Sequence, residues 1–329
     1  MIGRVLAAVL LFPLLLPLAG CETLAYYKQA IGGQLEILNA ARPLDEWLSD
    51  PATSPALRER LDVAKRIREF ASRELALPDN RSYTRYAKLD RPFAVWNVFA
   101  APEFSVEPRQ ECFPVTGCVA YRGFFSEKDA RAHAERLRAE GYDAYVGGVP
   151  AYSTLGWFND PLLSTFIRYP DAQLARLVFH ELAHQVAYTA HDTAFNESFA
   201  VTVEQEGVKR WLQAEGRSAE LESFNALQAR RQQFAGRVKE TRSRLAALYA
   251  QGLPPEVMKQ KKAEEYARLR ASYPSVIPQE PNNAFLVSVS LYTELVPQFE
   301  RLLRESGSLK AFYARVRELA KTEEYRRSF

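Results

Sequence analysis

Histidine, cysteine and unbalanced charge are all scarce in this chain of 329 residues. It contains four histidines and three cysteines, and its 43 basic and 40 acidic side chains leave a formal net charge of only +3. A nucleic-acid-binding surface usually requires a strongly basic face, so this balance gives no electrostatic case for a nucleic-acid partner. The composition is that of a globular protein with one large domain or two smaller ones.

The first twenty residues differ from the rest of the chain. They read MIGRVLAAVLLFPLLLPLAG, with one charge at Arg4, an apolar run broken by two prolines, and small residues before Cys21. This layout is typical of a secretory signal, and the run is short for a transmembrane helix. Residues 18–21, LAGC, resemble the lipobox of bacterial lipoproteins. The resemblance implies cleavage after residue 20, a lipid on Cys21 that holds the protein on a membrane, and, because Glu22 follows, the outer membrane facing the periplasm. A plain signal peptide or a membrane anchor is the alternative.

The two other cysteines lie close together in the segment ECFPVTGC. Cys112 and Cys118 would be exported into an oxidising compartment, where a disulfide that closes a short loop is expected. Because no histidine is near in sequence, a metal site is disfavoured. Two free thiols are the alternative.

Hydrophobic periodicity predicts a predominantly helical α+β protein. Aromatic and β-branched residues favour strands at 93–99, 117–125 and 142–149, and an amphipathic helix is expected at 126–141. These elements form a small α/β layer within a region spanning residues 21–150. Helices are also expected from residue 23 to about 42, interrupted at Gly32-Gly33, and at 54–76. His133, among the charges of helix 126–141, is expected to be solvated.

Residues 151–329 are expected to form a second, almost entirely helical region. Residues 219–251 and 255–273 predict two long polar helices, which together form a hairpin arm at about 219–273 with solvated faces. An arm that binds a partner or a membrane is the alternative. Residues 282–307 predict one strongly apolar helix packed in the core.

Three of the four histidines lie in one apolar segment, residues 177–200, which reads LVFHELAHQVAYTAHDTAFNESFA. The HELAH sequence places His180 and His184 on one face of a helix, one turn apart. This spacing lets two ring nitrogens bind a single zinc ion. Glu181 can take a proton from a water that the metal activates, so it is the predicted general base. The alternative is a pair of core histidines hydrogen-bonded to the backbone.

A zinc site of this kind needs a third protein ligand. We expect the first helix to end near residues 189–190, and a cap at Asp192 or Thr193 to start a second helix. His184 and Glu197 would then each lie roughly 7 Å from the corner at 1.5 Å per residue, so they can meet across the packed helix pair. Glu197 is therefore the predicted third ligand.

Several other residues remain candidates. Glu204, Glu206 and His191 are alternative third ligands, although His191 does not fit the H-E-x-x-H-x-x-G-x-x-H pattern of metzincins, since residues 187 and 190 are both alanine. When water attacks a carbonyl group, negative charge develops on the carbonyl oxygen. Tyr292 is the candidate residue that donates a hydrogen bond to this oxyanion. Tyr188 is an alternative residue near the metal.

These motifs resemble those of a known family of enzymes. HELAH followed by FNESFA at residues 195–200 is similar to the gluzincin metallopeptidases, whose L-N-E-G-F-A segment supplies the third ligand in zinc aminopeptidases. The resemblance implies that Glu197 has this role. The spacer between the motifs is shorter here, and the G-x-M-E-N segment that binds a substrate's amino terminus is missing. Most of the chain, including YYKQAIGGQLEIL, STLGWFNDP, FHELAHQ and DTAFNESFA, resembles a bacterial lipoprotein family of predicted aminopeptidases.

The sequence thus predicts a zincin-like metallopeptidase, tethered to a membrane through Cys21. One Zn²⁺ ion would be held by His180, His184 and Glu197, and Glu181 would act as base in hydrolysing a peptide or protein substrate, as an aminopeptidase. An endoprotease with the same chemistry is one alternative. The other is a non-catalytic lipoprotein that keeps the metal for stability and binds partners through the helical arm.

Overall fold

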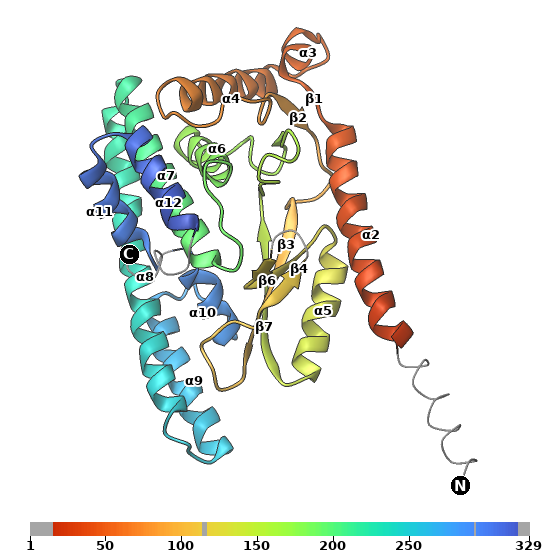
Figure 1. Ribbon diagram of the computed structural model, residues 1–329, viewed down its shortest axis with the longest axis vertical. Helices are drawn as coiled ribbons and strands as arrows, with labels where there is room; N and C mark the ends of the chain where they lie inside the picture. The colour runs from red at the N-terminus through yellow and green to blue at the C-terminus, as the bar shows by residue number, and fades with distance from the viewer. Residues whose placement is uncertain (1–15, 114–116, 293, 322–329) are drawn as a thin grey trace.

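The computed structural model describes residues 16–113, 117–292 and 294–321 (Figure 1). Residues 1–15 of the predicted signal peptide lie outside these ranges, and the side chain of Cys21 is likewise outside the description. The helices are α2 (Leu16–Ala40), α3 (Leu44–Ser49), α4 (Pro55–Arg73), α5 (Glu127–Ala139), α6 (Asp171–His184), α7 (Thr193–Ala214), α8 (Ser218–Tyr249), α9 (Pro255–Ser272), α10 (Asn283–Ser290), α11 (Val296–Ser306) and α12 (Leu309–Lys321). The strands are β1 (Arg42–Pro43), β2 (Arg85–Ala87), β3 (Val95–Pro102), β4 (Glu111–Phe113), β5 (Gly117–Val119), β6 (Tyr121–Phe124), β7 (Tyr142–Val149) and β8 (Leu162–Leu163). The predominantly helical α+β class is confirmed.

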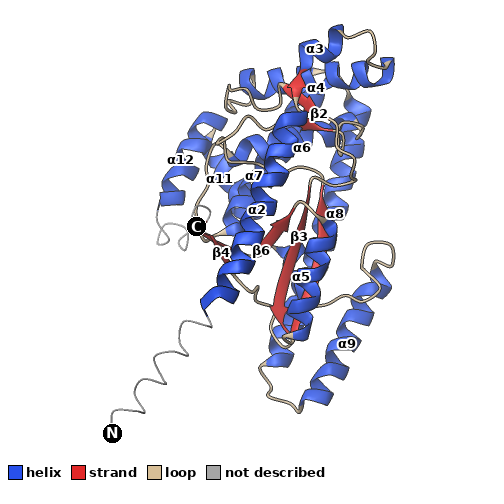
Figure 2. Ribbon diagram, turned by 90° about the vertical axis from the view of Figure 1, so that its right-hand side faces the viewer, coloured by secondary structure: helices blue, strands red, loops and turns tan. Residues whose placement is uncertain are grey.

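A small antiparallel sheet, in the order β6-β3-β7, stands at the centre of the molecule. Both faces of β3 are buried because each is covered by a helix. Trp96 and Val98 pack with Ala134 of α5 on one face, and Phe99 packs with Val287 of α10 on the other. Figure 2 shows α5 lying along the sheet. Residues of β3 at odd positions therefore face away from α5, toward the helices of the second half of the chain.

The helices α6 and α7 pack side by side in the main core, with α4, α11 and α12 around them (Figure 1). A glycine allows their close approach at one point. A Cβ atom on Gly207 of α7 would lie 2.7 Å from the ring of Phe179 on α6 and 2.8 Å from Leu75. A side chain at position 207 would therefore require the Phe179 ring, the Leu75 side chain or the helices themselves to shift.

Two predictions about helix continuity are wrong. The helix α2 runs through Gly32-Gly33 without interruption, and the close packing of the Phe125 ring against Gly33 gives that glycine its purpose. The apolar segment 282–307 is two helices, not one, because α10 ends at Ser290 and α11 begins at Val296 with a proline in its first turn. Tyr292 consequently lies between two helices.

His133 and the hairpin are more enclosed than expected. His133 is buried against the ring of Phe124 instead of being solvated. The hairpin α8–α9 forms as predicted but packs its inner face on α10 and on the segment after β3. Lys262 of α9 is paired with Asp143 of β7 at 2.7 Å. Within the described residues, none of the helices combines the length and the hydrophobicity needed to cross a bilayer.

Candidate metal centre

The helix α6 is held at its amino end by charges. Asp171 in its first turn bonds Arg60 of α4 at 2.5 Å and Arg217, which precedes α8, at 3.0 Å. A carboxylate is also favoured at this end by the helix dipole. From Leu174 onward almost every side chain of α6 is buried. The histidine-bearing turns are thus fixed between other elements of the core.

A short turn joins α6 to α7. The helix α6 ends at His184, about one and a half turns earlier than expected, and α7 begins at Thr193. The Asp192 side chain caps α7 by accepting a hydrogen bond from the Phe195 amide at 2.9 Å. Asn196 closes the corner, because its side chain bonds both the amide and the carbonyl of Thr189. The first turn of α7 is therefore directed back toward the end of α6.

Two imidazoles and one carboxylate converge at this corner. His180 and His184 face each other with their Nε2 atoms 3.2 Å apart. Oε2 of Glu197 lies 3.3 Å from Nε2 of His180 and 3.8 Å from Nε2 of His184. One ligand atom from each residue can be chosen so that all three lie within 4.8 Å of one another, and all three residues are buried. The structure brings together the three residues predicted as ligands.

Glu204 lies behind this cluster and contacts the other side of one histidine. Its Oε2 is 2.9 Å from Nδ1 of His180, and both its oxygens accept hydrogen bonds from Arg176. Nδ1 of His180 can therefore donate to Glu204 while Nε2 stays free for a cation. Such an arrangement fixes the tautomer and orientation of a ligand histidine. Glu204, considered as an alternative ligand, instead supports His180.

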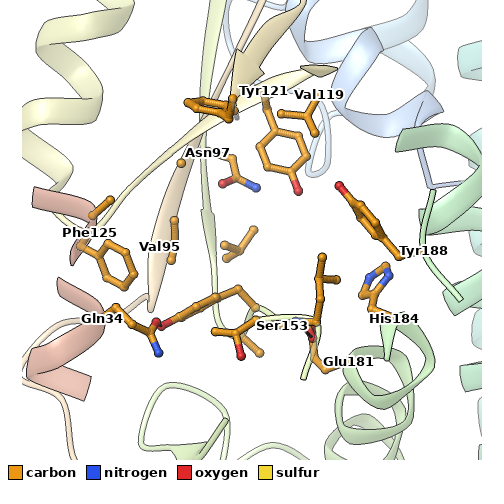
Figure 3. A pocket seen from close by; sticks show the side chains of 18 of the residues that line it. Gln34, Val95, Asn97, Val119, Tyr121, Phe125, Ser153, Glu181, His184 and Tyr188 are labelled. Atoms are coloured by element: carbon orange, nitrogen blue, oxygen red, sulfur yellow. Dashed lines mark hydrogen bonds between the residues drawn. The ribbon is translucent and has the colours of Figure 1, made fainter. Parts of the chain in front are cut away.

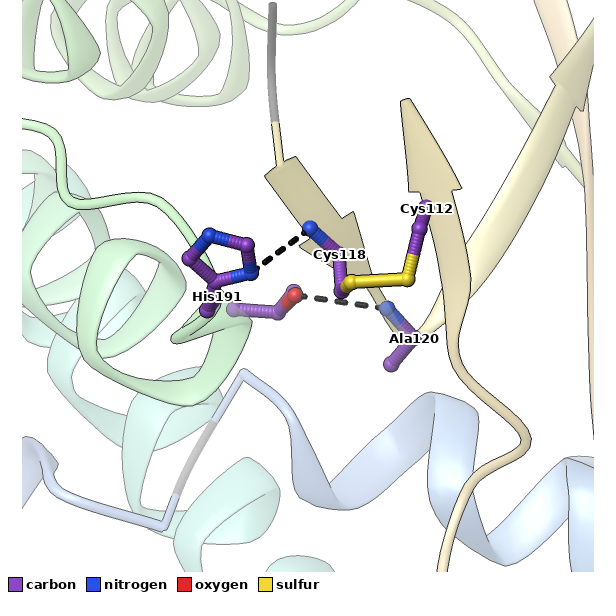
Figure 4. The surroundings of a disulfide bond; sticks show 5 residues. Cys112, Cys118, Ala120 and His191 are labelled. Atoms are coloured by element: carbon purple, nitrogen blue, oxygen red, sulfur yellow. Dashed lines mark hydrogen bonds between the residues drawn. A yellow bond between two sulfur atoms is a disulfide. The ribbon is translucent and has the colours of Figure 1, made fainter. Parts of the chain in front are cut away.

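The two other alternative ligands lie elsewhere. Glu206 pairs with Arg210 at 2.7 Å on α7. His191 lies on the turn before α7, where its Nδ1 accepts a hydrogen bond from the Cys118 amide at 3.0 Å (Figure 4). Cys118 is joined to Cys112 by a disulfide across β4 and β5. His191 thus fastens this disulfide-linked hairpin to the corner between α6 and α7.

The two histidines differ in their affinity for a proton. Burial lowers the pKa of His184 to about 4, so its imidazole is neutral and offers a lone pair. Burial also acts to lower the pKa of His180, but hydrogen bonds to Glu197 and Glu204 outweigh it and raise the pKa to about 10. In the absence of a metal, His180 is protonated on both ring nitrogens, and it donates from Nδ1 to Glu204 and from Nε2 to Glu197. A cation would have to displace the proton on Nε2, as is usual for metal sites built from histidine.

Glu181 is buried and lines the same cavity as the three-residue cluster, but it is not part of that cluster. Burial is the main cause that raises its pKa to about 7; the charge of Glu197 adds to this and His180 opposes it. A carboxyl group with a pKa near neutrality can both accept and return a proton. The geometry and the pKa fit a proton-transfer role better than a ligand role.

A cavity of about 530 Å³ opens over the cluster. Figure 3 shows that α6 contributes Glu181 and His184, the sheet contributes Val95, Asn97 and Tyr121, and α2 contributes Gln34. Most of the remaining lining is aromatic or aliphatic. It includes Tyr26, Tyr27, Phe113, Phe125, Val149, Ala151, Tyr152, Leu155 and Trp157. This cavity suits a ligand with apolar side chains and a polar group directed at the cluster.

Three tyrosines lie near the three candidate ligands in the cavity. Tyr292 packs near His180, with the ring centroids 6.4 Å apart, and Tyr121 of β6 and Tyr188 line the same space. Burial raises the pKa of all three hydroxyl groups, so each stays protonated at neutral pH and can donate a hydrogen bond. The sequence identified Tyr292 and Tyr188 as candidates but missed Tyr121.

The missed features have different causes. Tyr121 lies on a strand remote in sequence from HELAH, and no local pattern indicates that β6 borders the site. The supporting role of Glu204 could have been inferred, because it lies seven residues after Glu197 and thus on the same face of α7. The contribution of α2 to the cavity was also missed.

The donor set itself fits a metal ion. Two neutral-imidazole nitrogens and a carboxylate form the ligand set of many catalytic zinc sites. A ligand histidine usually donates its other ring N–H to a carboxylate, and Glu204 is placed to accept it from His180. The fold and the cluster together define an α+β protein with a candidate metal centre in an apolar cavity. A family model described as "Putative aminopeptidase" matches residues 25–329, and the chain belongs to this family. No curated protein and no solved structure matches the chain.

Proposed function

We propose that the protein is a zinc metallopeptidase of the gluzincin type, acting as an aminopeptidase. The observation that carries this proposal is the convergence of His180, His184 and Glu197 beneath a cavity into which Glu181 also projects. The family description supports the aminopeptidase assignment. The zincin-like fold, the identity of the metal and the mechanism are parts of the proposal.

Different side chains would bind the metal ion and transfer protons. His180, His184 and Glu197 would hold the ion, and Glu204 would keep His180 in the tautomer that presents Nε2. A bound zinc ion supplies a Lewis acid that activates water and polarises a carbonyl group. Glu181 accepts the proton from the attacking water on its carboxylate and later gives it to the leaving amine.

The developing oxyanion requires a hydrogen-bond donor from the protein. Tyr292, the sequence candidate, lines the cavity beside His180, and Tyr121 enters the cavity from the sheet. Both hydroxyl groups are protonated because burial raises their pKa well above the usual value. We retain Tyr292 as the proposed donor and add Tyr121 as the second donor that the structure makes available.

The remaining parts of the proposal concern location and partners. The lipobox resemblance supports cleavage after residue 20 and acylation of Cys21, with the protein held on the outer membrane facing the periplasm. The partners are then a peptide or protein substrate and the membrane. The near-neutral charge gives no reason to add a nucleic acid.

The decisive experiment combines metal analysis with one substitution. We expect the purified protein to contain one zinc per chain and to hydrolyse aminoacyl fluorogenic substrates. Glu181→Gln should lower kcat by at least about 10²-fold, because it removes the group that accepts the proton, and should leave the zinc content unchanged. Equal activity in the wild-type and Glu181→Gln proteins would refute the proposed mechanism.

One observation favours an endopeptidase as the second candidate. Among the described residues that line the cavity, the carboxylates are Glu181 and Glu197. If Glu197 binds the metal and Glu181 transfers protons, no further carboxylate in that lining remains to bind the ammonium group of a substrate's amino terminus. Paired peptides with free and acetylated amino termini distinguish the candidates: an aminopeptidase cleaves only the free form, and an endopeptidase cleaves both.

A further inference from the structure

Exposed apolar side chains are concentrated near the cavity. In the described part of the chain, the large hydrophobic residues that are well exposed are Leu24, Ile31, Leu35, Trp157, Phe158, Val257 and Val276. Three lie on α2 and two lie on the loop between β7 and β8. Both of these segments line the cavity over His180, His184 and Glu197. Five of the seven exposed side chains therefore belong to the two segments that border its opening.

The three residues on α2 form one stripe, which we call the α2 stripe. Leu24, Ile31 and Leu35 are spaced by seven and four residues, so they project from one side of the helix. Their exposed fractions are 71%, 60% and 50%. The adjacent side of the helix carries Tyr27 and Gln34, which line the cavity. The stripe thus runs along the flank of α2 next to the cavity.

The loop between β7 and β8 carries the second exposed group, which we call the aromatic tip. Trp157 is 75% exposed although it also lines the cavity, and Phe158 is 48% exposed. The loop is not loosely held, because Asp160 accepts hydrogen bonds from both the amide and the hydroxyl of Thr154. The aromatic tip therefore lies on a turn that these hydrogen bonds hold in place at the edge of the cavity.

The position of the stripe indicates what covers it. Leu24 lies three residues after Cys21, a rise of about 4.5 Å along the helix. In both membrane-attached cases, an acylated Cys21 or residues 1–20 kept as an anchor, the membrane lies at this end of α2; a plain cleaved signal peptide would leave no attachment there. A helix that starts at the bilayer and exposes an apolar flank is suited to lie in the interface, and tryptophan favours the same zone.

We propose that the α2 stripe and the aromatic tip rest on the surface of the bilayer to which the amino end of α2 is attached. The cavity then opens along the membrane, and substrates reach it from the lipid–water interface. This proposal rests on the membrane attachment proposed above. Only the statement that substrates enter from the interface also depends on the peptidase assignment.

The fluorescence of Trp157 provides the test. Of the four tryptophans, Trp96 and Trp211 are buried and Trp47 is partly buried, so Trp157 is the one accessible to lipid. The full-length protein is placed in vesicles of phosphatidylethanolamine and phosphatidylglycerol, with or without bromine on the acyl chains. We expect bromine to quench the wild-type protein and to have little effect on Trp157→Phe, which gives the baseline of the other tryptophans.

Substitution of the stripe provides the second measurement. The triple variant Leu24→Gln, Ile31→Gln, Leu35→Gln should reduce the Trp157 quenching by about twofold or more, because three apolar side chains no longer partition into the lipid. Its thermal melt should match the wild type, since the three side chains are exposed. The matched control is Val257→Gln, Val276→Gln on and after α9, which should leave the quenching unchanged.

Two results would overturn the proposal. One is equal bromine quenching of the wild-type and Trp157→Phe proteins in vesicles with which both co-sediment. The other is concentration-dependent dimerisation that the triple variant abolishes, without bromine quenching, which would assign the stripe to a second copy of the chain. Neither measurement uses catalysis, so failure here and failure of the peptidase proposal are distinguishable.

Discussion

The helix pair α6–α7 and the hairpin α8–α9 each contain an arginine–glutamate pair of almost the same length. Arg176 and Glu204 are 2.9 Å apart between α6 and α7, and Arg237 and Glu240 are 3.0 Å apart within α8. The exposed fractions of the side chains differ greatly, at 22% and 3% in the first pair and 63% and 54% in the second. Similar geometry is therefore found in opposite environments.

The difference in exposure decides whether an ionised side chain is stabilised by water or by other side chains. In the hairpin, water solvates each ion and screens the attraction, so the pair contributes little. Behind the candidate metal centre Glu204 is buried, and it stays ionised because Arg176 and His180 lower its pKa against the effect of burial. Charges in α6–α7 must be satisfied by other residues, which explains why the cluster is so extensively paired.

The largest effect is expected for Glu197→Gln. This change removes the anionic ligand but keeps the size of the side chain, so we expect zinc affinity to fall by more than about 10²-fold and activity with it. Competition with a chelator measures the affinity. Glu206→Gln on the same helix is the matched control, because Glu206 pairs with Arg210 away from the cluster. Equal loss in both variants would contradict the assignment of Glu197.

Glu204→Gln should have a smaller effect that is still specific. The change removes the charge behind His180, and loss of such a support commonly weakens metal binding by about 10- to 100-fold. We expect zinc affinity to fall within this range while the residual activity at saturating zinc stays measurable. Unchanged zinc affinity would show that Glu204 is only a structural partner of Arg176.

Asp160→Asn probes a buried carboxyl group near the cavity without changing the candidate metal ligands. Burial raises the pKa of Asp160 from 3.8 to about 6. The carboxyl group of Asp160 binds its proton more tightly in the folded state than in the unfolded state. Its contribution to the stability of the wild type is therefore fully present below about pH 4, and about 3 kcal/mol of stability is lost as the pH rises through about 6. Urea denaturation should show a gain for Asp160→Asn at pH 8 relative to its effect at pH 4. A difference independent of pH would refute this explanation.

The smallest effect is expected in the hairpin. Glu240→Gln breaks the exposed pair with Arg237 and should change the free energy of unfolding by less than about 0.5 kcal/mol, with zinc affinity unaffected. The same denaturation experiment checks it. A change as large as that of Glu204→Gln in either quantity would remove the distinction between the two regions.

Local signals allowed much of the site to be predicted from the sequence. The histidine spacing, the cap at Asp192 and the following glutamate are all encoded within about twenty residues, so the corner between α6 and α7 could be anticipated. Tyr121 and the cavity face of α2 could not, because they reach the site only through packing between distant segments. The break between α10 and α11 was missed because a continuous apolar pattern conceals the helix start at Val296.

The glycine at position 207 has a consequence for how the candidate metal centre could have arisen or could be lost. A glutamate side chain has a fixed reach, so the gap between two helix backbones decides whether its oxygen meets an imidazole. Here Gly207 allows α7 to lie close to Phe179, the residue next to His180, because a Cβ atom at position 207 would be 2.7 Å from the Phe179 ring. Gly207→Ala, a methyl group about 15 Å along the helix from Glu197, would alter the fit of the cluster without altering any group that belongs to it.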